Sequence, residues 1–524
     1  MKRRNFLKAA TTFSAPVLLG GMKVAAIANS SLFPIINNGD NNKILVIIQL
    51  NGGNDGLNML VPLDQYESLL SARSNIMIPE NKLTSLTDTL AVHPTMEGVK
   101  RLYDDAKLSI VQSVGYPNQN RSHFRSKDIW MSGSESDEYL SSGWIGRYFD
   151  TVHTEYPTDY PSADNPDPIA ITVGSLVSET CQGAGANFSL ALKDPFSLSP
   201  LTEAQEGELP DNYYGQELAF LRTAITQTNA YGEVIVKAAE KGTNAGGTYP
   251  EKGVNPLAEQ LKIVANLISG GLQTKVYIVS LGGFDTHSDQ VMMSDTALGE
   301  HAVLLGQLSE AIESFQKDLE QQNLSERVMG MTFSEFGRRI RSNGSFGTDH
   351  GSAAPLMIFG SCVNGAIIGD NPVIPEEVGS KDGVAMQFDF RSVYGSLLID
   401  WFEAEESTVR SLLYDDFQYI PLVEGCNKTT SINTIFKQQE VLFIENSPNP
   451  FSQLTNIYFE SKGEHIRLSI FDANGSELAV LTNQHIAKGK HQVTYHTSTL
   501  AAGNYYCRMQ TSRGSKVVLM VKVR

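Results

Sequence analysis

Over residues 40–425, stretches with apolar residues at helical spacing alternate with short runs of consecutive apolar residues. Amphipathic stretches at 256–268 and 297–319 place their apolar residues on one helical stripe. The runs between such stretches are apolar on both faces and rich in β-branched residues, as central parallel strands are, and they lie at 43–50, 108–114, 168–173, 275–281, 328–333 and 355–359. The pattern predicts an α/β fold with a mostly parallel sheet sandwiched by helices. Residues 156–215, rich in Pro, Asp, Ser and Gly, look like an insertion or a lid over the sheet edge.

The pattern changes to a period of two in residues 441–524. Ile466, Leu468 and Ile470 alternate with polar residues, and an Asp-Ala-Asn-Gly turn follows at 472–475. About seven such short strands predict a small all-β, immunoglobulin-like sandwich. This segment is basic on balance, whereas the whole chain has a net charge of −17. We therefore expect a separate C-terminal domain, joined by a linker at 426–440.

The N-terminal 28 residues predict a twin-arginine export signal. Arg3 and Arg4 precede a short, mildly apolar stretch, and an Ala-Ile-Ala cleavage site stands at 26–28. A membrane anchor is the alternative, but the stretch is too short to span a bilayer well. No other segment has 18 unbroken apolar residues, so the mature chain is expected to lack a transmembrane segment. The net negative charge argues against nucleic acid and against anionic membrane surfaces.

Cysteine spacing gives little guidance to chemistry. The four cysteines are widely scattered and form no CxxC pair, so a cysteine metal cluster or a redox dithiol is not expected. An exported protein enters a compartment that permits a disulfide, and the spacing leaves the pairing open.

Polar clusters follow four of the predicted strands, and parallel strands would bring them together at one edge of the sheet. Clustered carboxylates repel one another unless a cation neutralises them. Carboxylate and imidazole ligands suit zinc, manganese, magnesium or calcium, so the sequence predicts one or two divalent ions. The predicted metal ligands are Asp55, Asp285, His287, Glu335, Asp349 and His350. The predicted catalytic residues are Ser122, His123 and Arg125, because a serine beside a metal is an activated nucleophile and an arginine fork matches a tetrahedral oxyanion.

Each of these residues also has a plainer interpretation. Asp55 and Ser122 could be helix caps, and Asp285 with His287 could cap the helix that follows. Asp349 and His350 could form a loop salt bridge. His301 lies within an amphipathic stretch and is expected to be structural or exposed, and His93 is expected to be near the site only as a minor alternative. The joint occurrence at successive strand ends favours the functional interpretation.

The tail resembles the C-terminal sorting domain of the type nine secretion system of Bacteroidetes. The similar stretches are Ser-Pro-Asn-Pro-Phe at 447–451, Thr-Asn-Ile at 455–457, Phe-Asp-Ala-Asn-Gly at 471–475 and Leu-Ala-Ala-Gly-Asn-Tyr-Tyr at 500–506. The resemblance implies transport across the outer membrane by that machinery, after which the tail is removed or exchanged for a surface anchor. A carbohydrate-binding or adhesive sandwich is the alternative.

The main domain resembles the exported bacterial family called domain of unknown function 1501, through residues 49–62, 113–133, 143–149, 281–287 and 332–338. The resemblance implies an alkaline phosphatase-like fold, as in sulfatases and cofactor-independent phosphoglycerate mutases, with two divalent metals. It implies that Asp55 is the first-strand ligand and Ser122 the nucleophile. Asp285 and His287 then match the late Asp and His of the superfamily, Glu335 takes the place of Asp in its Asp-His pair, and His350 matches the final His.

The chain departs from that superfamily in three ways. Asp285 and His287 are two residues apart instead of four, and Phe336 stands where the paired His would be. In another alignment, Asp349 and His350 form the pair, which leaves Glu335 to a different role. The sequence around Ser122 lacks the Cys/Ser-x-Pro-x-Arg pattern that makes formylglycine, so ordinary sulfatase chemistry is disfavoured.

The sequence therefore favours a secreted or cell-surface metal-dependent hydrolase of phosphate or sulfate esters, acting on a small molecule or a glycan. The main alternative is a non-catalytic exported surface protein that keeps a degenerate phosphatase-like fold for binding or for secretion support. A serine hydrolase using Ser122 and a nearby histidine is a third hypothesis, although no G-x-S-x-G elbow is present. The sequence leaves open whether the chain is an enzyme.

Overall fold

The computed structural model falls into two units, Met1–Lys43 and Ile44–Arg524. It describes residues 18–19, 22–23, 42–158, 160–198, 213–245, 249–414, 416–424, 443–473, 475–498, 500–511 and 514–523. In the first unit, β1 (Leu18–Leu19) pairs with β2 (Met22–Lys23). Most of the predicted export signal and the whole of the predicted linker lie outside the described residues.

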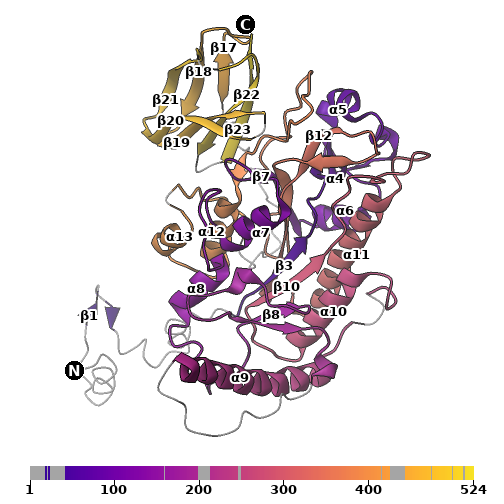
Figure 1. Cartoon of the computed structure of the whole chain (residues 1–524), viewed down its shortest axis with the longest axis vertical. Helices are drawn as coiled ribbons and strands as arrows, with labels where there is room; N and C mark the ends of the chain where they lie inside the picture. Colours follow the sequence, from indigo (N-terminus) through magenta and orange to yellow (C-terminus); the bar gives the residue numbers. More distant parts are fainter. Residues whose placement is uncertain are drawn as a thin grey trace. The chain divides into compact units, whose positions relative to one another are not determined.

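A nine-stranded sheet forms the centre of the main domain (Figure 1). Its order is β15-β7-β14-β11-β3-β10-β8-β9, with β16 also paired to β7. The strands are β3 (Ile44–Leu50), β7 (Leu108–Gly115), β8 (Ala170–Val173), β9 (Ser189–Leu192), β10 (Val276–Leu281), β11 (Val328–Ser334), β14 (Ala354–Phe359), β15 (Ile367–Ile368) and β16 (Phe388–Asp389). β3 pairs in parallel with β10 and with β11. The predicted α/β class is confirmed, and β3, β7, β10 and β11 run in one direction.

The predicted orientation of one strand was wrong. Residues 355–359 were expected to be parallel, but β14 runs antiparallel to both β11 and β7. A parallel connection needs a long crossover, usually a helix. Here β12 (Arg338–Ser342) and β13 (Thr348–His350) instead form an antiparallel hairpin between β11 and β14. The hairpin begins at the edge of the sheet where β11 ends and returns the chain to the same edge, where β14 begins.

Helices cover both faces of the sheet. One core unites alternate residues of β3 (Ile44, Val46, Ile48) with α6 (Glu97–Asp104), α9 (Tyr213–Lys241), α10 (Pro256–Ser269) and α11 (Glu300–Gln321). The other core unites Leu45 and Ile47 with α7 (His123–Ser132), α8 (Trp144–Val152), α12 (Phe390–Asp400) and α13 (Glu406–Leu412). Because both faces are buried, the strands need apolar residues throughout, as the sequence pattern indicated.

The two predicted helices are present as α10 and α11. Asn255 caps α10 by accepting hydrogen bonds from the amides of Leu257 and Ala258, and Pro256 occupies the first turn. In α11 the predicted stripe is buried at Leu308, Ile312, Phe315 and Leu319. The expected insertion at 156–215 instead contributes β8 and β9, which extend the sheet beyond β10.

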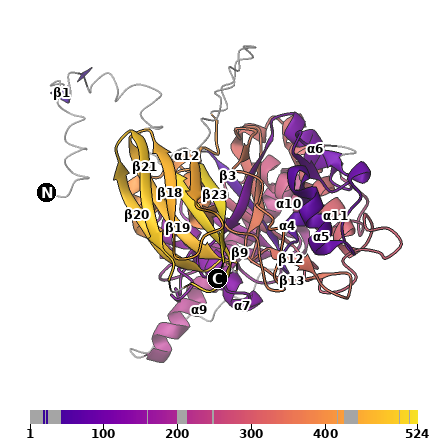
Figure 2. The ribbon, with the colours of Figure 1, turned by 90° about the horizontal axis from the view of Figure 1, so that it is seen from above.

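The C-terminal segment forms two antiparallel sheets, as predicted, and its strands can be followed in Figure 2. Three strands have the order β17-β18-β21, and four have the order β20-β19-β22-β23. They are β17 (Ile444–Ser447), β18 (Leu454–Ser461), β19 (Glu464–Asp472), β20 (Glu477–Ile486), β21 (Gly489–His496), β22 (Gly503–Thr511) and β23 (Gly514–Lys522). The alternating Ile466, Leu468 and Ile470 are buried, so the predicted period-two strand is confirmed.

Within the described ranges, none of the helices combines the length and the apolar character needed to cross a membrane. Cys362 is disulfide-bonded, whereas Cys181 and Cys507 are buried free thiols.

Candidate metal centre

The turn after β3 holds Asp55 in a buried ion pair. Its carboxylate lies 2.8 Å from Nη1 of Arg73, on α5 (Tyr66–Arg73), and accepts a hydrogen bond from Nε2 of Gln290 at 2.7 Å. Burial raises the pKa of Asp55, but the charges of Arg73 and His301 and the hydrogen bonds of Gln290 and Arg73 together outweigh that effect and hold the pKa below its ordinary value. Asp55 is therefore committed to Arg73 and Gln290, and it is not among the residues whose ligand atoms converge.

Two glycines of the same turn allow the strand ends to approach one another closely. A Cβ at Gly52 would lie 2.3 Å from the amide nitrogen of Asp285, and a Cβ at Gly53 would lie 2.3 Å from the ring of Phe336. Both residues have positive φ, +123° and +82°, which glycine adopts without strain. The glycines thus bring the loops after β10 and β11 against the end of β3. We call this edge of the sheet the rim.

Three histidine rings surround one carboxylate oxygen at the rim. Asp285 follows β10, His123 is the first residue of α7, and His350 is the last residue of β13. The Nε2 atoms of His123, His287 and His350 lie 3.3, 3.2 and 3.3 Å from Oδ1 of Asp285. The Nε2 atoms of His287 and His350 are 2.8 Å apart. The structure therefore brings together Asp285, His287 and His350, which we expected as ligands, and His123, which we expected to be catalytic.

Two of these rings are held by acceptors on their outer side. Nδ1 of His350 lies 2.7 Å from the backbone carbonyl of Arg121, which can only accept a hydrogen bond, so this nitrogen carries the proton. Nδ1 of His287 lies 3.1 Å from Oδ1 of Asp349, whose other oxygen accepts from Arg339 at 3.0 Å. In a neutral imidazole, a protonated Nδ1 leaves Nε2 with its lone pair directed at the cluster.

The ring of His123 is likewise held by an acceptor at Nδ1. Nδ1 of His123 lies 2.9 Å from Oε1 of Glu335, which also accepts a hydrogen bond from the amide of Gly52 at 2.9 Å. Nε2 of His123 is buried and has no hydrogen-bond partner among the described atoms. A histidine held by a carboxylate at one nitrogen and directed at a ligand site with the other is the usual arrangement around a protein-bound metal.

Electrostatics favour a charged Asp285 carboxylate and a neutral His350 ring. Desolvation raises the pKa of Asp285, but the hydrogen bond that Nη2 of Arg338 donates at 2.7 Å, the charge of Arg338 and the hydrogen bond of His350 together outweigh it, and the pKa falls to about 2. Burial lowers the pKa of His350 below its ordinary value. Ligand atoms of His123, Asp285 and His350 therefore converge, and Nε2 of His287 lies beside them, 3.2 Å from the same carboxylate oxygen. A cation would stabilise this set of donors.

The donor set fits one transition-metal ion. The imidazole nitrogens of His123 and His350 and the carboxylate oxygen of Asp285 suit zinc or manganese, whereas calcium and magnesium prefer oxygen ligands throughout. Glu335 and Asp349 were expected as direct ligands, but the structure places them behind His123 and His287 as hydrogen-bond acceptors. With Asp55 also engaged, the described residues offer one converging set of donors.

The predicted catalytic serine is exposed at the rim. Ser122 is the N-cap residue of α7, and its hydroxyl makes no capping hydrogen bond. Its neighbour His123 belongs to the cluster, so the hydroxyl lies one residue from a candidate ligand.

The predicted oxyanion arginine is occupied elsewhere. Arg125 pairs with Asp128, donates to carbonyls of 135–138 and stacks 3.8 Å from the centre of the Tyr139 ring. Lys127, which we did not predict, is better placed than Arg125 to face an anion at the rim. It lies one turn after His123 on α7, and its Nζ donates to Oδ1 of Asn51 at 3.3 Å, at the end of β3.

Two residues that sequence reasoning did not assign support the rim. Arg338 is buried and donates to the carbonyls of Gly53 at 2.7 Å and Phe284 at 3.0 Å as well as to Asp285. Phe336 packs against two of the histidines, with ring centres 5.0 Å from His123 and 4.6 Å from His350. Their only sequence signal was the Ser-Glu-Phe-Gly-Arg stretch that follows β11.

The other two buried histidines form a structural pair. Nε2 of His301 lies 2.9 Å from Oδ1 of Asn54, and the ring centres of His93 and His301 are 6.5 Å apart. Burial lowers the pKa of His93 to about 3 and that of His301 to about 4. Both rings are therefore neutral at ordinary pH and lie outside the converging cluster.

Comparison with known sequences gives two family matches. The sequence model described as "Protein of unknown function (DUF1501)" matches residues 42–387. The model described as "Secretion system C-terminal sorting domain" matches residues 447–522, so the prediction of a C-terminal sorting domain is confirmed. No curated protein matches the sequence.

Solved structures similar to this chain have low TM-scores. The PsFucS1 sulfatase from Pseudoalteromonas sp. is 10% identical, with 92% of this chain and 89% of that chain covered and a TM-score of 0.32. A protein in the alkaline phosphatase superfamily from Vibrio parahaemolyticus is 9% identical, with 80% and 76% covered and a TM-score of 0.30.

PorZ, described as an essential surface component of the type-IX secretion system of Porphyromonas gingivalis, is 15% identical. The match covers 16% of this chain and 11% of PorZ, with a TM-score of 0.12, so this chain spans only a small part of PorZ. Because all these TM-scores are low, the fold assignment rests on the strand order of the sheet itself.

Proposed function

We propose, from the premise that this chain belongs to the family described as protein of unknown function (DUF1501), that its main domain is a metal-dependent hydrolase of phosphate or sulfate esters. One observation carries the proposal: three histidine Nε2 atoms lie 3.2–3.3 Å from one carboxylate oxygen of Asp285. Each of these rings has its Nδ1 held by an acceptor on the outer side.

His123, Asp285, His287 and His350 would hold one divalent ion, with zinc or manganese as the best match to their donors. Such an ion, when bound, supplies Lewis acidity and lowers the pKa of a coordinated oxygen. Glu335 and Asp349 orient the rings of His123 and His287, a role that differs from the direct ligation predicted from the sequence. Asp55 has a structural role in this proposal, because its carboxylate is paired with Arg73.

Ser122 is the proposed nucleophile. Its Oγ would lose its proton and form a bond to the phosphorus or sulfur of the ester while the bond to the alcohol oxygen breaks and that oxygen takes up a proton. Water then hydrolyses the covalent intermediate, and Oγ regains a proton. The N-terminus of α7, a ten-residue helix, favours negative charge at this position. Lys127, one turn further on, would face the non-bridging oxygens in place of the predicted Arg125.

Metal analysis and turnover of the full chain test this proposal together. Wild-type protein is expected to retain about one zinc or manganese ion per chain and to hydrolyse p-nitrophenyl phosphate or p-nitrophenyl sulfate. His350→Ala is expected to lose both the ion and the turnover. Ser122→Ala is expected to keep the ion and to lose turnover by about 100-fold or more. His465→Ala, an exposed histidine of the C-terminal domain, is the matched control.

Three outcomes would count against the enzyme. Protein without bound metal, or metal retained fully by His350→Ala, would remove the metal centre. Equal turnover by Ser122→Ala would remove the proposed nucleophile. Bound metal without turnover on a broad panel of esters would favour the non-catalytic surface protein.

The sorting domain supports the proposal that the hydrolase acts outside the cell. Residues 447–522 would be recognised by the type nine secretion machinery, after export to the periplasm by the twin-arginine signal at 1–28. A variant lacking residues 441–524 is expected to accumulate in the periplasm, as cell fractionation would show. Surface delivery of that variant at the wild-type level would refute the role of the tail.

A further inference from the structure

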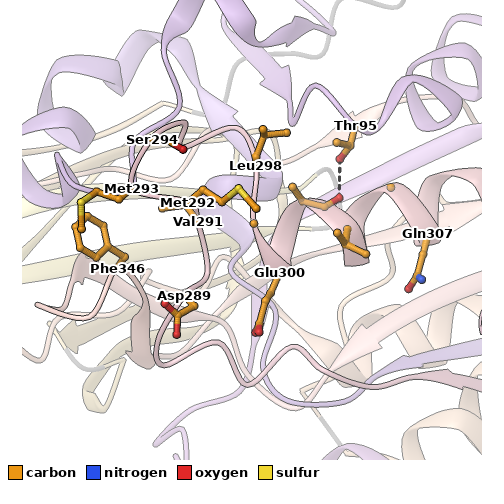
Figure 3. Close-up of a pocket in the computed structure, with 14 residues that line it drawn as sticks. Thr95, Asp289, Val291, Met292, Met293, Ser294, Leu298, Glu300, Gln307 and Phe346 are labelled. Atoms are coloured by element: carbon orange, nitrogen blue, oxygen red, sulfur yellow. Dashed lines mark hydrogen bonds between the residues drawn. The ribbon is translucent and has the colours of Figure 1, made fainter.

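A large apolar pocket is lined by the loop after β10, the start of α11 and the tip of the β12–β13 hairpin (Figure 3). Its volume is about 1170 Å³, large enough for a ligand of drug size or more. The loop after β10 supplies Met292, Met293 and Leu298, the start of α11 supplies Val303, and Phe346 comes from the tip of the β12–β13 hairpin. The side chain of Met293 is 77% exposed and that of Val303 is 60% exposed. Exposed apolar side chains gathered around a pocket mark a binding site more often than a plain surface.

Two short chain segments connect the lining of the pocket with the histidine cluster. Asp289, which lines the pocket, lies two residues after His287, and its amide donates to the carbonyl of Ser345 at 3.1 Å. The side chain of Asn343, in the same hairpin tip, donates to the carbonyl of His287 at 2.8 Å. One rigidly tied loop pair therefore forms the wall of the pocket and carries the ligand His287.

The wall favours an alkyl chain over a sugar. Each sugar hydroxyl that is buried without a partner costs free energy, and the exposed wall of the pocket is mainly apolar. Five of the lining residues are polar, namely Thr95, Asp289, Ser294, Glu300 and Gln307. The hydroxyl of Thr95 already donates to the carbonyl of Ala302 at 3.1 Å (Figure 3). Methionine side chains are flexible and adapt to chains of variable shape. Met292 and Met293 fit that role.

We infer that the pocket binds the alkyl chain of an amphiphilic ester whose anionic group lies at the histidine cluster. The proposed substrate class is thus a monomeric long-chain phosphate or sulfate ester. The position of the anionic end rests on the proposed function, whereas the position of the alkyl chain rests on the pocket alone.

Binding of n-alkyl phosphonates to the full chain tests the pocket without requiring turnover, because their carbon–phosphorus bond is not an ester. Butyl-, hexyl- and octylphosphonate are titrated calorimetrically below their aggregation limits. Affinity is expected to rise about fourfold for each methylene buried. Val303→Glu is expected to abolish this rise, and Met293→Glu is a second variant at an even more exposed position. Val152→Glu, at an exposed site on α8, is the matched control and is expected to keep it.

The dependence on chain length and the overall affinity test different proposals. In His350→Ala, the increase per methylene is expected to persist while all three affinities fall by a similar factor. If His350→Ala keeps both the increase in affinity per methylene and the wild-type affinities, the proposal that the pocket binds the alkyl chain is supported. The proposal that the histidine cluster binds the anionic group then fails. A flat series in wild-type protein, or a full increase in both pocket variants, overturns the pocket proposal. A flat series combined with Val303-dependent sedimentation on phosphatidylcholine vesicles overturns it in favour of a membrane-docking surface.

Discussion

Each histidine of the rim uses its two ring nitrogens differently. Nδ1 of His123, His287 and His350 faces an acceptor, and Nε2 faces Asp285. A sequence shows which residues carry imidazoles and carboxylates, but not which carboxylate faces a metal and which supports a ligand. Glu335 was expected as a direct ligand, and the structure places its carboxylate against Nδ1 of His123.

Asp55 shows a second limit to what the sequence alone can predict about a single residue. Its position after β3 is where the superfamily resemblance implies a ligand, and the structure pairs it with Arg73. Arg73 follows it by 18 residues, on a separate helix, with no motif that links the two. Only the tertiary arrangement reveals that this carboxylate is already neutralised.

The carboxylates that accept from Nδ1 of the histidines, those of Glu335 and Asp349, provide a prediction at the residue scale. Glu335→Gln removes the charge behind His123 but keeps the shape of the side chain, so metal affinity is expected to fall about 10- to 100-fold. Competition with a chromophoric zinc chelator measures this change.

Asp55→Asn is the contrasting variant. It leaves the Arg73 charge buried without its partner, so the free energy of unfolding is expected to fall by about 3–5 kcal/mol while the zinc dissociation constant stays unchanged. Weaker zinc binding in Asp55→Asn than in Glu335→Gln would instead make Asp55 a ligand, as the sequence predicted.

At the element scale, the strands were the most predictable part of the chain. A strand buried on both faces must be apolar throughout, and β3, β7, β10 and β11 all agree with their predicted ranges to within a residue or two. The direction of β14 could not be inferred in this way, because the same composition suits a buried antiparallel strand. The short hairpin before it, with no helix, was the signal for its direction.

The apolar pocket was not predicted at all. Met292, Met293 and Leu298 lie in a loop with no regular spacing, and Val303 lies on the outer side of a helix whose inner stripe was recognised. Periodicity identifies residues that face a core, and these residues do not. Exposed apolar side chains form a site only when separate elements place them together.

For the whole molecule, the change of period separates two stretches that match the expected families, at residues 42–387 and 447–522. The sandwich has seven described strands in two sheets, in agreement with the prediction. The boundaries of the export signal and of the linker remain predictions.

Acid stability of the whole chain provides a further prediction. Burial holds the pKa of His93 at about 3 and that of His301 at about 4, below the ordinary histidine value. Between about pH 6.5 and pH 4 the unfolded chain binds protons that the native chain does not, so the free energy of unfolding is expected to fall by a few kcal/mol over this window. Above pH 6.5 both histidines are neutral in both states and contribute no pH dependence.

Urea unfolding at a series of pH values measures this effect. His301→Gln is expected to reduce the dependence between pH 6.5 and pH 4 by about half, because His93 still contributes, and His465→Gln, at an exposed position, is expected to leave it unchanged. An equal dependence in wild-type protein and His301→Gln would show that His301 does not resist protonation in the native state.

The hairpin of β12 and β13 gives this architecture a particular evolutionary freedom. Its base carries Arg338 and His350, which belong to the rim, and its tip carries Phe346, which lines the pocket. Surface loops accept insertions and deletions far more readily than the strands that hold them. A change in the length of this tip would therefore reshape the wall of the pocket at Phe346 while Arg338 and His350 stay in place at the base.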